Sequence, residues 1–85
     1  MATLRTKAQR THGRPEKERL IAAVKAAREE KGMSQRALSE AVGVHPMTIH
    51  RFESGERLLD VLELVDIARA LEIDPVTLFR LALGD

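Results

Sequence analysis

The sequence contains no cysteine, tryptophan or tyrosine, and Phe52 and Phe79 are its only phenylalanines. The lack of cysteine excludes disulfides and thiolate metal sites and is compatible with a reducing compartment. With so few aromatic residues, the core has to be built from aliphatic side chains. No apolar run approaches the ~18 residues of a membrane-spanning helix. Residues 1–10 also lack the apolar segment of a secretory signal, so we expect a cytoplasmic protein.

Charge is distributed unevenly along a chain whose 85 residues suffice for one domain. Residues 1–15 carry four basic and no acidic side chains, whereas residues 16–85 carry ten basic and thirteen acidic ones. We expect residues 1–13 to form a basic, flexible N-terminal arm and residues 14–85 to form the folded domain. Such asymmetry weakly indicates nucleic acid as a partner, although a solvated leader explains the arm alone equally well.

Start and stop signals predict five helices. Residues 15–31 begin with a proline and acidic residues, and residues 35–42 follow the N-cap Ser34 and end at Gly43. Two proline-initiated helices are expected over 46–53 and 75–83, and a cap pair, Asp60 and Glu63, starts another between them. Because strand signals are lacking, the sequence predicts an all-α domain.

The stretch from Ser34 to Gly55 predicts two short helices joined by a tight turn at Gly43. Its apolar residues would hold the helices at a steep angle, and the second helix would present Met47, Thr48, His50 and Arg51 to solvent. This is the layout of a helix-turn-helix DNA reader.

Several residues in register then make the sequence resemble a known family. Residues 28–35 look like the beginning of that family's helix two, and residues 64–71 look like its fourth helix; between them lie Leu38, Gly43, Val44, Ile49, Glu53 and Gly55. The sequence resembles the Cro and phage-repressor type (XRE-like) helix-turn-helix domains. The resemblance implies a compact five-helix, lambda-repressor-like fold with the helix-turn-helix at helices 2 and 3. It also implies a transcriptional regulator of prokaryotic or phage origin, such as a repressor or controller-type protein.

The resemblance further implies a set of residues that contact double-stranded DNA. Those expected at base edges are Pro46, Met47, His50 and Arg51, and those expected at the phosphate backbone are Gln35, Thr48 and Arg57. Separately from the resemblance, the basic arm that carries Arg10 and Arg14 is expected to follow the DNA backbone or to enter the minor groove. Arg51 is the strongest candidate, because a guanidinium can donate two hydrogen bonds to guanine. Pro46 departs from the family pattern, since proline cannot read donors or acceptors. His50 could contact a phosphate or a base, or be a solvated histidine.

Two further positions concern the structure of the motif. In the family, the residues that match Arg28 and Glu53 form an ion pair between helix one and the end of the recognition helix. The alternative is two surface charges of little energetic value. Ser39 stands where the family prefers a smaller residue, so its hydroxyl should need a partner, such as a carbonyl one turn back.

Apolar residues near the C-terminus suggest a contact between subunits. We expect a homodimer on a palindromic operator, joined through Leu58, Leu59, Leu78, Leu81 and Leu83. The excess apolar face of the helix that follows Asp60 is expected to contribute to the same contact; alternatively, all these residues only close the monomer core. A second class of function is an antitoxin or protein-interaction module that binds a partner protein through Leu58, Leu59 and helix 75–83. An enzyme is disfavoured because no catalytic constellation is present. No cofactor is expected, and His45 and His50 without further ligands make a poor metal site.

Overall fold

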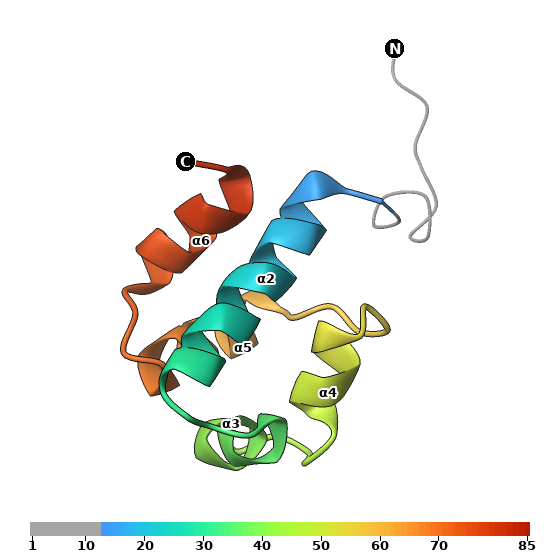
Figure 1. Ribbon diagram of the computed structural model, residues 1–85, viewed down its shortest axis with the longest axis vertical. Helices are drawn as coiled ribbons and strands as arrows, with labels where there is room; N and C mark the ends of the chain where they lie inside the picture. Colours follow the sequence, from blue (N-terminus) through green and yellow to red (C-terminus); the bar gives the residue numbers. More distant parts are fainter. Residues whose placement is uncertain (1–12) are drawn as a thin grey trace.

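A computed structural model describes residues 13–85, which form five α-helices and no strand (Figure 1). They are α2 (Pro15–Glu30), α3 (Gln35–Val42), α4 (Thr48–Glu53), α5 (Val61–Ala70) and α6 (Pro75–Leu83). The all-α, five-helix fold expected from the sequence is confirmed. Most of the predicted arm, including Arg10, lies outside the described residues.

The helices begin where local chemistry can satisfy their first backbone N–H groups. Ser34 accepts a hydrogen bond from the backbone of Ala37 at 3.0 Å before α3. Asp60 and Glu63 form the reciprocal capping box at the start of α5. Asp74 accepts from the backbone of Val76 at 2.8 Å before α6. These contacts explain why the predicted ranges of most helices agree with the structure to within a residue.

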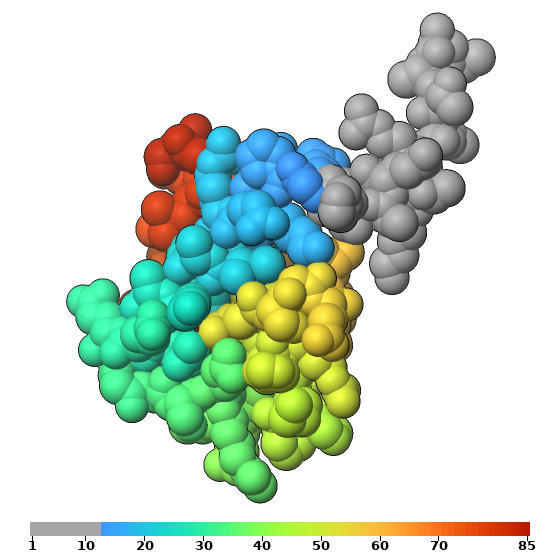
Figure 2. All heavy atoms as spheres, turned by 45° about the vertical axis from the view of Figure 1, so that its right-hand side comes forward, coloured from blue at the N-terminus to red at the C-terminus, as the bar shows by residue number. Residues whose placement is uncertain are grey.

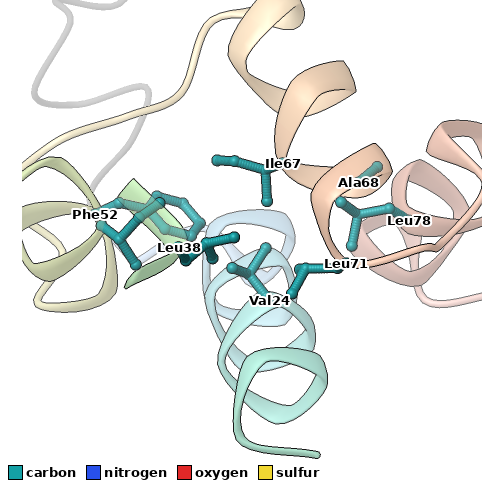
Figure 3. Packing of buried hydrophobic residues seen from close by; sticks show 8 residues of the cluster. Val24, Leu38, Phe52, Ile67, Ala68, Leu71 and Leu78 are labelled. Atoms are coloured by element: carbon teal, nitrogen blue, oxygen red, sulfur yellow. The ribbon is translucent and has the colours of Figure 1, made fainter. Parts of the chain in front are cut away.

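A single aliphatic core joins the helices, with Phe52 as its only buried aromatic side chain (Figure 3). The core consists of Val24, Leu38, Ile49, Phe52, Ile67, Ala68, Leu71 and Leu78. Helix α2 runs through the middle of the molecule, with α6 beside its N-terminal half and α3 and α4 at the opposite end (Figure 1). The helix-turn-helix pair is therefore well separated from the C-terminal helix. No helix within residues 13–85 has the length and apolar character needed to cross a membrane.

Candidate nucleic-acid interface

The turn between α3 and α4 depends on Gly43, whose φ of 82° lies in the left-handed region. Its N–H donates to the carbonyl of Ser39 at 3.0 Å, and the N–H of Val44 donates to the same carbonyl at 3.1 Å. A Cβ added at Gly43 would meet no atom within 4 Å. The position thus favours glycine because of its backbone conformation and not because of crowding.

Ser39 ties the two helices of the motif together. Its side chain is fully buried, and its hydroxyl accepts a hydrogen bond from the backbone N–H of Ile49 at 3.2 Å. The expected bond to a carbonyl one turn back is therefore replaced by an interhelical one. Ile49 lies in the first turn of α4, where backbone N–H groups have no partner within the helix. Ser39 on α3 supplies that partner.

Helix α4 begins at Thr48, two residues later than predicted. The N–H of Thr48 donates to the carbonyl of His45 at 2.9 Å, and the N–H of Met47 donates to the Nδ1 of His45 at 3.1 Å. Pro46 has no N–H to satisfy and fits between them. Pro46 and Met47 consequently form a tight turn that leads into the helix.

Three of the predicted base-reading side chains are grouped on the outer surface of α4 and its leading turn. His50 and Arg51 are exposed, and Met47 is 43% exposed. No acidic side chain within residues 13–85 forms an ion pair with Arg51. Pro46 is exposed beside them. In Figure 2 the atoms of α3 (green) and α4 (yellow) adjoin on one face of the molecule.

Thr48 does not belong to this exposed group. It is 6% exposed, because the side of α4 that carries Ile49 and Phe52 packs into the core. The prediction that α4 presents Thr48 to solvent was therefore wrong. A phosphate contact from this residue remains only a prediction.

Arg28 and Glu53 form the ion pair between α2 and the end of α4. The Nε and Nη2 atoms of Arg28 donate to the two carboxylate oxygens of Glu53 at 2.8 and 2.9 Å. The Nη1 of Arg28 donates to the carbonyl of Met33 at 2.8 Å. The two side chains are only 10% and 4% exposed. The pair is thus buried, bidentate and part of a larger network.

Opposing effects act on the pKa of Glu53. Burial raises it, but the hydrogen bonds from Arg28 and Gln35 and the positive charges of Arg28 and Lys25 together hold the pKa below its ordinary value. The bond to Glu53 raises the pKa of Arg28 in turn. The end of α4 is therefore anchored to α2 by a carboxylate that stays ionised at neutral pH.

Gln35 was predicted to contact a phosphate, but both ends of its side-chain amide form hydrogen-bond contacts within the protein. Its Nε2 donates to Glu53 at 3.0 Å, and its Oε1 lies 3.1 Å from the Nδ1 of His50. Gln35 thereby links the buried ion pair to His50 on the exposed side of α4. Its role at a phosphate remains a prediction.

Arg57, another predicted phosphate contact, is paired with Glu63 at the start of α5. The two guanidinium–carboxylate distances are 3.0 and 2.7 Å, and Arg57 also donates to the carbonyl of Leu58 at 3.1 Å. The bond from Arg57 holds the pKa of Glu63 below its ordinary value. Arg57 thus fixes the loop before α5. Arg14, at the beginning of α2, is exposed and pairs with Glu16 at 3.3 Å.

The residues predicted at the dimer contact separate into two groups. Leu78 is fully buried in the monomer core, so its assignment to a surface contact was wrong. Leu59 is partly buried against that core. Leu58, Leu81 and Leu83 are 40%, 42% and 48% exposed. They remain candidates for a contact between subunits.

The sequence reasoning missed Phe79, which is 54% exposed on α6. The excess apolar face expected on the helix that follows Asp60 is present on α5, where Val61 and Leu62 are 74% and 75% exposed. A groove of about 490 Å³ lies between the loop before α5 and helices α2, α5 and α6, lined mainly by Leu20, Leu58, Leu59, Val61, Leu64 and Phe79. The sequence signal for the exposed apolar side chains of α6 was their number. The nine residues of this helix include more apolar side chains than one face packed on the core requires.

Comparisons with known proteins agree with this geometry. The sequence model of the family described as "Helix-turn-helix" matches residues 24–78. Two crystal structures of the clp gene regulator ClgR from Corynebacterium glutamicum are similar, each 29% identical in sequence over 81% of this chain. Their TM-scores are 0.71 and 0.72, and the matches cover 88% and 73% of the ClgR chains. Among curated proteins, none matches the sequence significantly.

The family match covers most of the chain and includes the whole α3–α4 motif. Together with the similar structures, it supports a DNA-binding transcriptional regulator. The chain belongs to the helix-turn-helix family of the Cro and phage-repressor type.

Proposed function

We propose that the protein is a sequence-specific transcriptional regulator that places α4 in the major groove of DNA. The observation that carries the proposal is the grouping of Met47, His50 and Arg51 on the exposed side of a helix whose other side is fixed. Ser39 and the Arg28–Glu53 pair hold that helix in place. A rigidly held helix with donors and apolar groups on its outer face suits the readout of base edges.

Individual roles follow from the chemistry of these side chains. Arg51 would donate to guanine, and Met47 would contact a thymine methyl group. Pro46 offers neither donor nor acceptor, so we expect loose base preference next to it. Gln35 and Arg57 can reach phosphates only by exchanging the carboxylates that they now contact. Arg14 is exposed and pairs with Glu16 only at the surface, and we propose that Arg14 and Arg10 supply backbone contacts through their positive charge.

We further propose a homodimer on a palindromic site, acting as a repressor or controller-type protein. One short helix in one groove gives limited specificity, and two-fold dimers on half-sites about one helical turn apart overcome this. The exposed apolar surface includes Leu58 in the loop before α5 and Phe79 on α6. Helix α6 lies away from α4 (Figure 1). The similar structure is that of a gene regulator, which favours the same class of role here.

The proposal is tested by selecting bound DNA from a random pool with the wild-type protein and with Arg51→Ala. We expect an enriched palindrome whose preference at one base pair per half-site relaxes in the variant, by about 1–3 kcal/mol of discrimination. Arg69→Ala removes an exposed arginine of α5 and serves as the charge-matched control, with an unchanged motif. If the wild type enriches no sequence, the regulator proposal is wrong.

The apolar groove also supports a second candidate, an antitoxin or protein-interaction module that binds another protein at Leu58, Leu59 and α6. Analytical ultracentrifugation separates the two uses of this surface. A dimer at tens of micromolar, about the range of weak self-association, supports the homodimer. A monomer at that concentration rejects the homodimer and leaves the surface to a different partner.

A further inference from the structure

Two histidines of the helix-turn-helix use the same ring nitrogen in different hydrogen bonds. The Nδ1 of His45 accepts from the backbone N–H of Met47 at 3.1 Å. The Nδ1 of His50 lies 3.1 Å from the side-chain oxygen of Gln35. A neutral imidazole carries a hydrogen on only one of its two nitrogens, so these partners determine which nitrogen that is.

The direction of the His50 bond is fixed by the ion pair behind it. Arg28 keeps Glu53 ionised, and a carboxylate can only accept hydrogen bonds. The atom of Gln35 that contacts Glu53 at 3.0 Å must therefore be the donor Nε2. The other end of the amide, Oε1, then faces His50. Because this oxygen carries no hydrogen, the hydrogen of the bond must be on the Nδ1 of His50.

In the neutral form of His50 the Nε2 consequently carries a bare lone pair, and the residue is exposed beside Arg51. We infer that the Nε2 of His50 is a hydrogen-bond acceptor that reads the amino group of an adenine or a cytosine in the major groove. This inference rests on the proposed function and defines the hydrogen-bonding role of His50 in it. Adenine N6 and cytosine N4 are the donors on major-groove base edges, whereas guanine and thymine present acceptors there.

The same geometry argues against a phosphate contact for His50. A lone pair directed at phosphate oxygens forms no hydrogen bond and is repelled by their charge. Arg51 has only donors and suits guanine, so these two adjacent residues would read base edges of opposite polarity. His45 is held in the other tautomer, with its hydrogen on Nε2, and provides an internal reference for His50.

Nitrogen-15 NMR of the histidine rings tests the tautomer without DNA. The full chain is measured at about pH 8, and the signals are assigned with His50→Asn and His45→Asn. We expect the hydrogen on Nδ1 in His50 and on Nε2 in His45. In Gln35→Ala, His50 should shift toward the other tautomer while His45 is unchanged. A hydrogen on the Nε2 of His50 in the wild type overturns the inference.

DNA selection tests the readout. His50→Ala identifies the base position that depends on this residue, and we expect adenine or cytosine there in the wild type. In Gln35→Ala that preference should fall by about three- to ten-fold, the effect of one hydrogen bond, while the guanine preference assigned to Arg51 remains. Circular dichroism checks that both variants are folded.

The possible failures have different meanings. Guanine or thymine at the His50-dependent position, or an unchanged preference in Gln35→Ala, refutes the acceptor role although the regulator proposal stands. If the wild type enriches no sequence, the regulator proposal fails and the readout fails with it. The NMR result decides the tautomer in either case.

Discussion

Two regions of the molecule differ in what they bury and what they expose. The reading end, named after the proposed function, consists of α3, α4 and the Arg28–Glu53 pair, and it buries charged groups. The α5–α6 side consists of α5, α6 and the loop before α5, and it exposes apolar groups. At the reading end, a charged pair is buried, with the Glu53 side chain only 4% exposed. On the α5–α6 side, Leu62 is 75% exposed and Phe79 is 54% exposed. The first region uses polar contacts to hold a helix in position. The second leaves apolar surface that the monomer does not use.

This difference suggests that one region determines the stability of the monomer and the other its association with a second chain. Hydrogen-bonded charges in a buried site are costly to break, because the remaining partner is left without solvent. An exposed leucine contributes little to the monomer, since folding does not remove it from water. We therefore expect substitutions at the reading end to affect folding and substitutions on the α5–α6 side to affect association.

Arg28→Ala should give the largest effect and would break the reading end. It leaves Glu53 buried without its cation and removes a donor to the carbonyl of Met33. We expect the free energy of unfolding to fall by about 3–5 kcal/mol, measured by urea denaturation. Arg36→Ala, in an exposed pair with Glu40, is the control and should change it by less than about 1 kcal/mol. Equal losses in the two variants would contradict the buried role.

Ser39→Ala should give the next largest effect. The substitution removes the acceptor for the backbone N–H of Ile49 in a fully buried position. We expect a loss of about 1–3 kcal/mol, the cost of leaving a buried donor unsatisfied, in the same denaturation experiment. Ser34→Ala removes an exposed cap of α3 and is predicted to cost about 1 kcal/mol. A stability unchanged by Ser39→Ala would show that the interhelical bond is not significant.

Acid should weaken the reading end gradually. Because the pKa of Glu53 in the folded protein lies below its ordinary value of 4.5, its stabilising contribution is complete above that pH. It is lost as the pH falls through the lower, folded pKa. The effect should be smaller than that of Arg28→Ala, since protonated Glu53 can still accept hydrogen bonds.

Urea denaturation of the wild type and Glu53→Gln across this pH range measures the contribution. The difference in stability between them should shrink as the pH falls below 4.5. The pKa of Glu63 is also lowered, by its bond to Arg57, so Glu63→Gln provides a comparison from outside the buried pair. A difference that does not depend on pH would contradict the ionised state of Glu53.

Leu62→Ser should have the smallest effect on monomer stability and would sharpen the comparison. Because Leu62 is largely exposed, we expect a change within about 0.5 kcal/mol, whereas the sedimentation of any dimer should shift toward monomer. Leu78→Ala is the matched substitution at a fully buried leucine and should cost about 2–5 kcal/mol. A large loss of monomer stability in Leu62→Ser would mean that the α5–α6 side is not free surface.

Much of the fold could be predicted because its signals are local. Capping residues, prolines and glycines act within one helical turn, and they predicted the ranges of α3 and α6 as observed. The beginning of α4 was missed by two residues, because the His45 side chain and carbonyl stabilise a turn in place of a first helical turn. Proline at position 46 is compatible with both conformations.

The candidate site was less predictable, since its contacts join distant residues. The Arg28–Glu53 pair was expected only through the family resemblance. Gln35 and Arg57 were assigned to phosphates, but in the structure both contact carboxylates. Their polar groups suit either partner, and sequence spacing does not say which one lies within reach.

The sequence by itself determined the helices, the aliphatic core and the presence of a helix-turn-helix, because propensity, capping and apolar periodicity act over a few residues. Only the tertiary structure decided which apolar residues face the core: Leu78 is buried, whereas Leu62 is exposed. It also decided how the polar groups of the motif are connected. Gln35 and His50 are fifteen residues apart, and only packing of α3 against α4 brings the amide between His50 and Glu53.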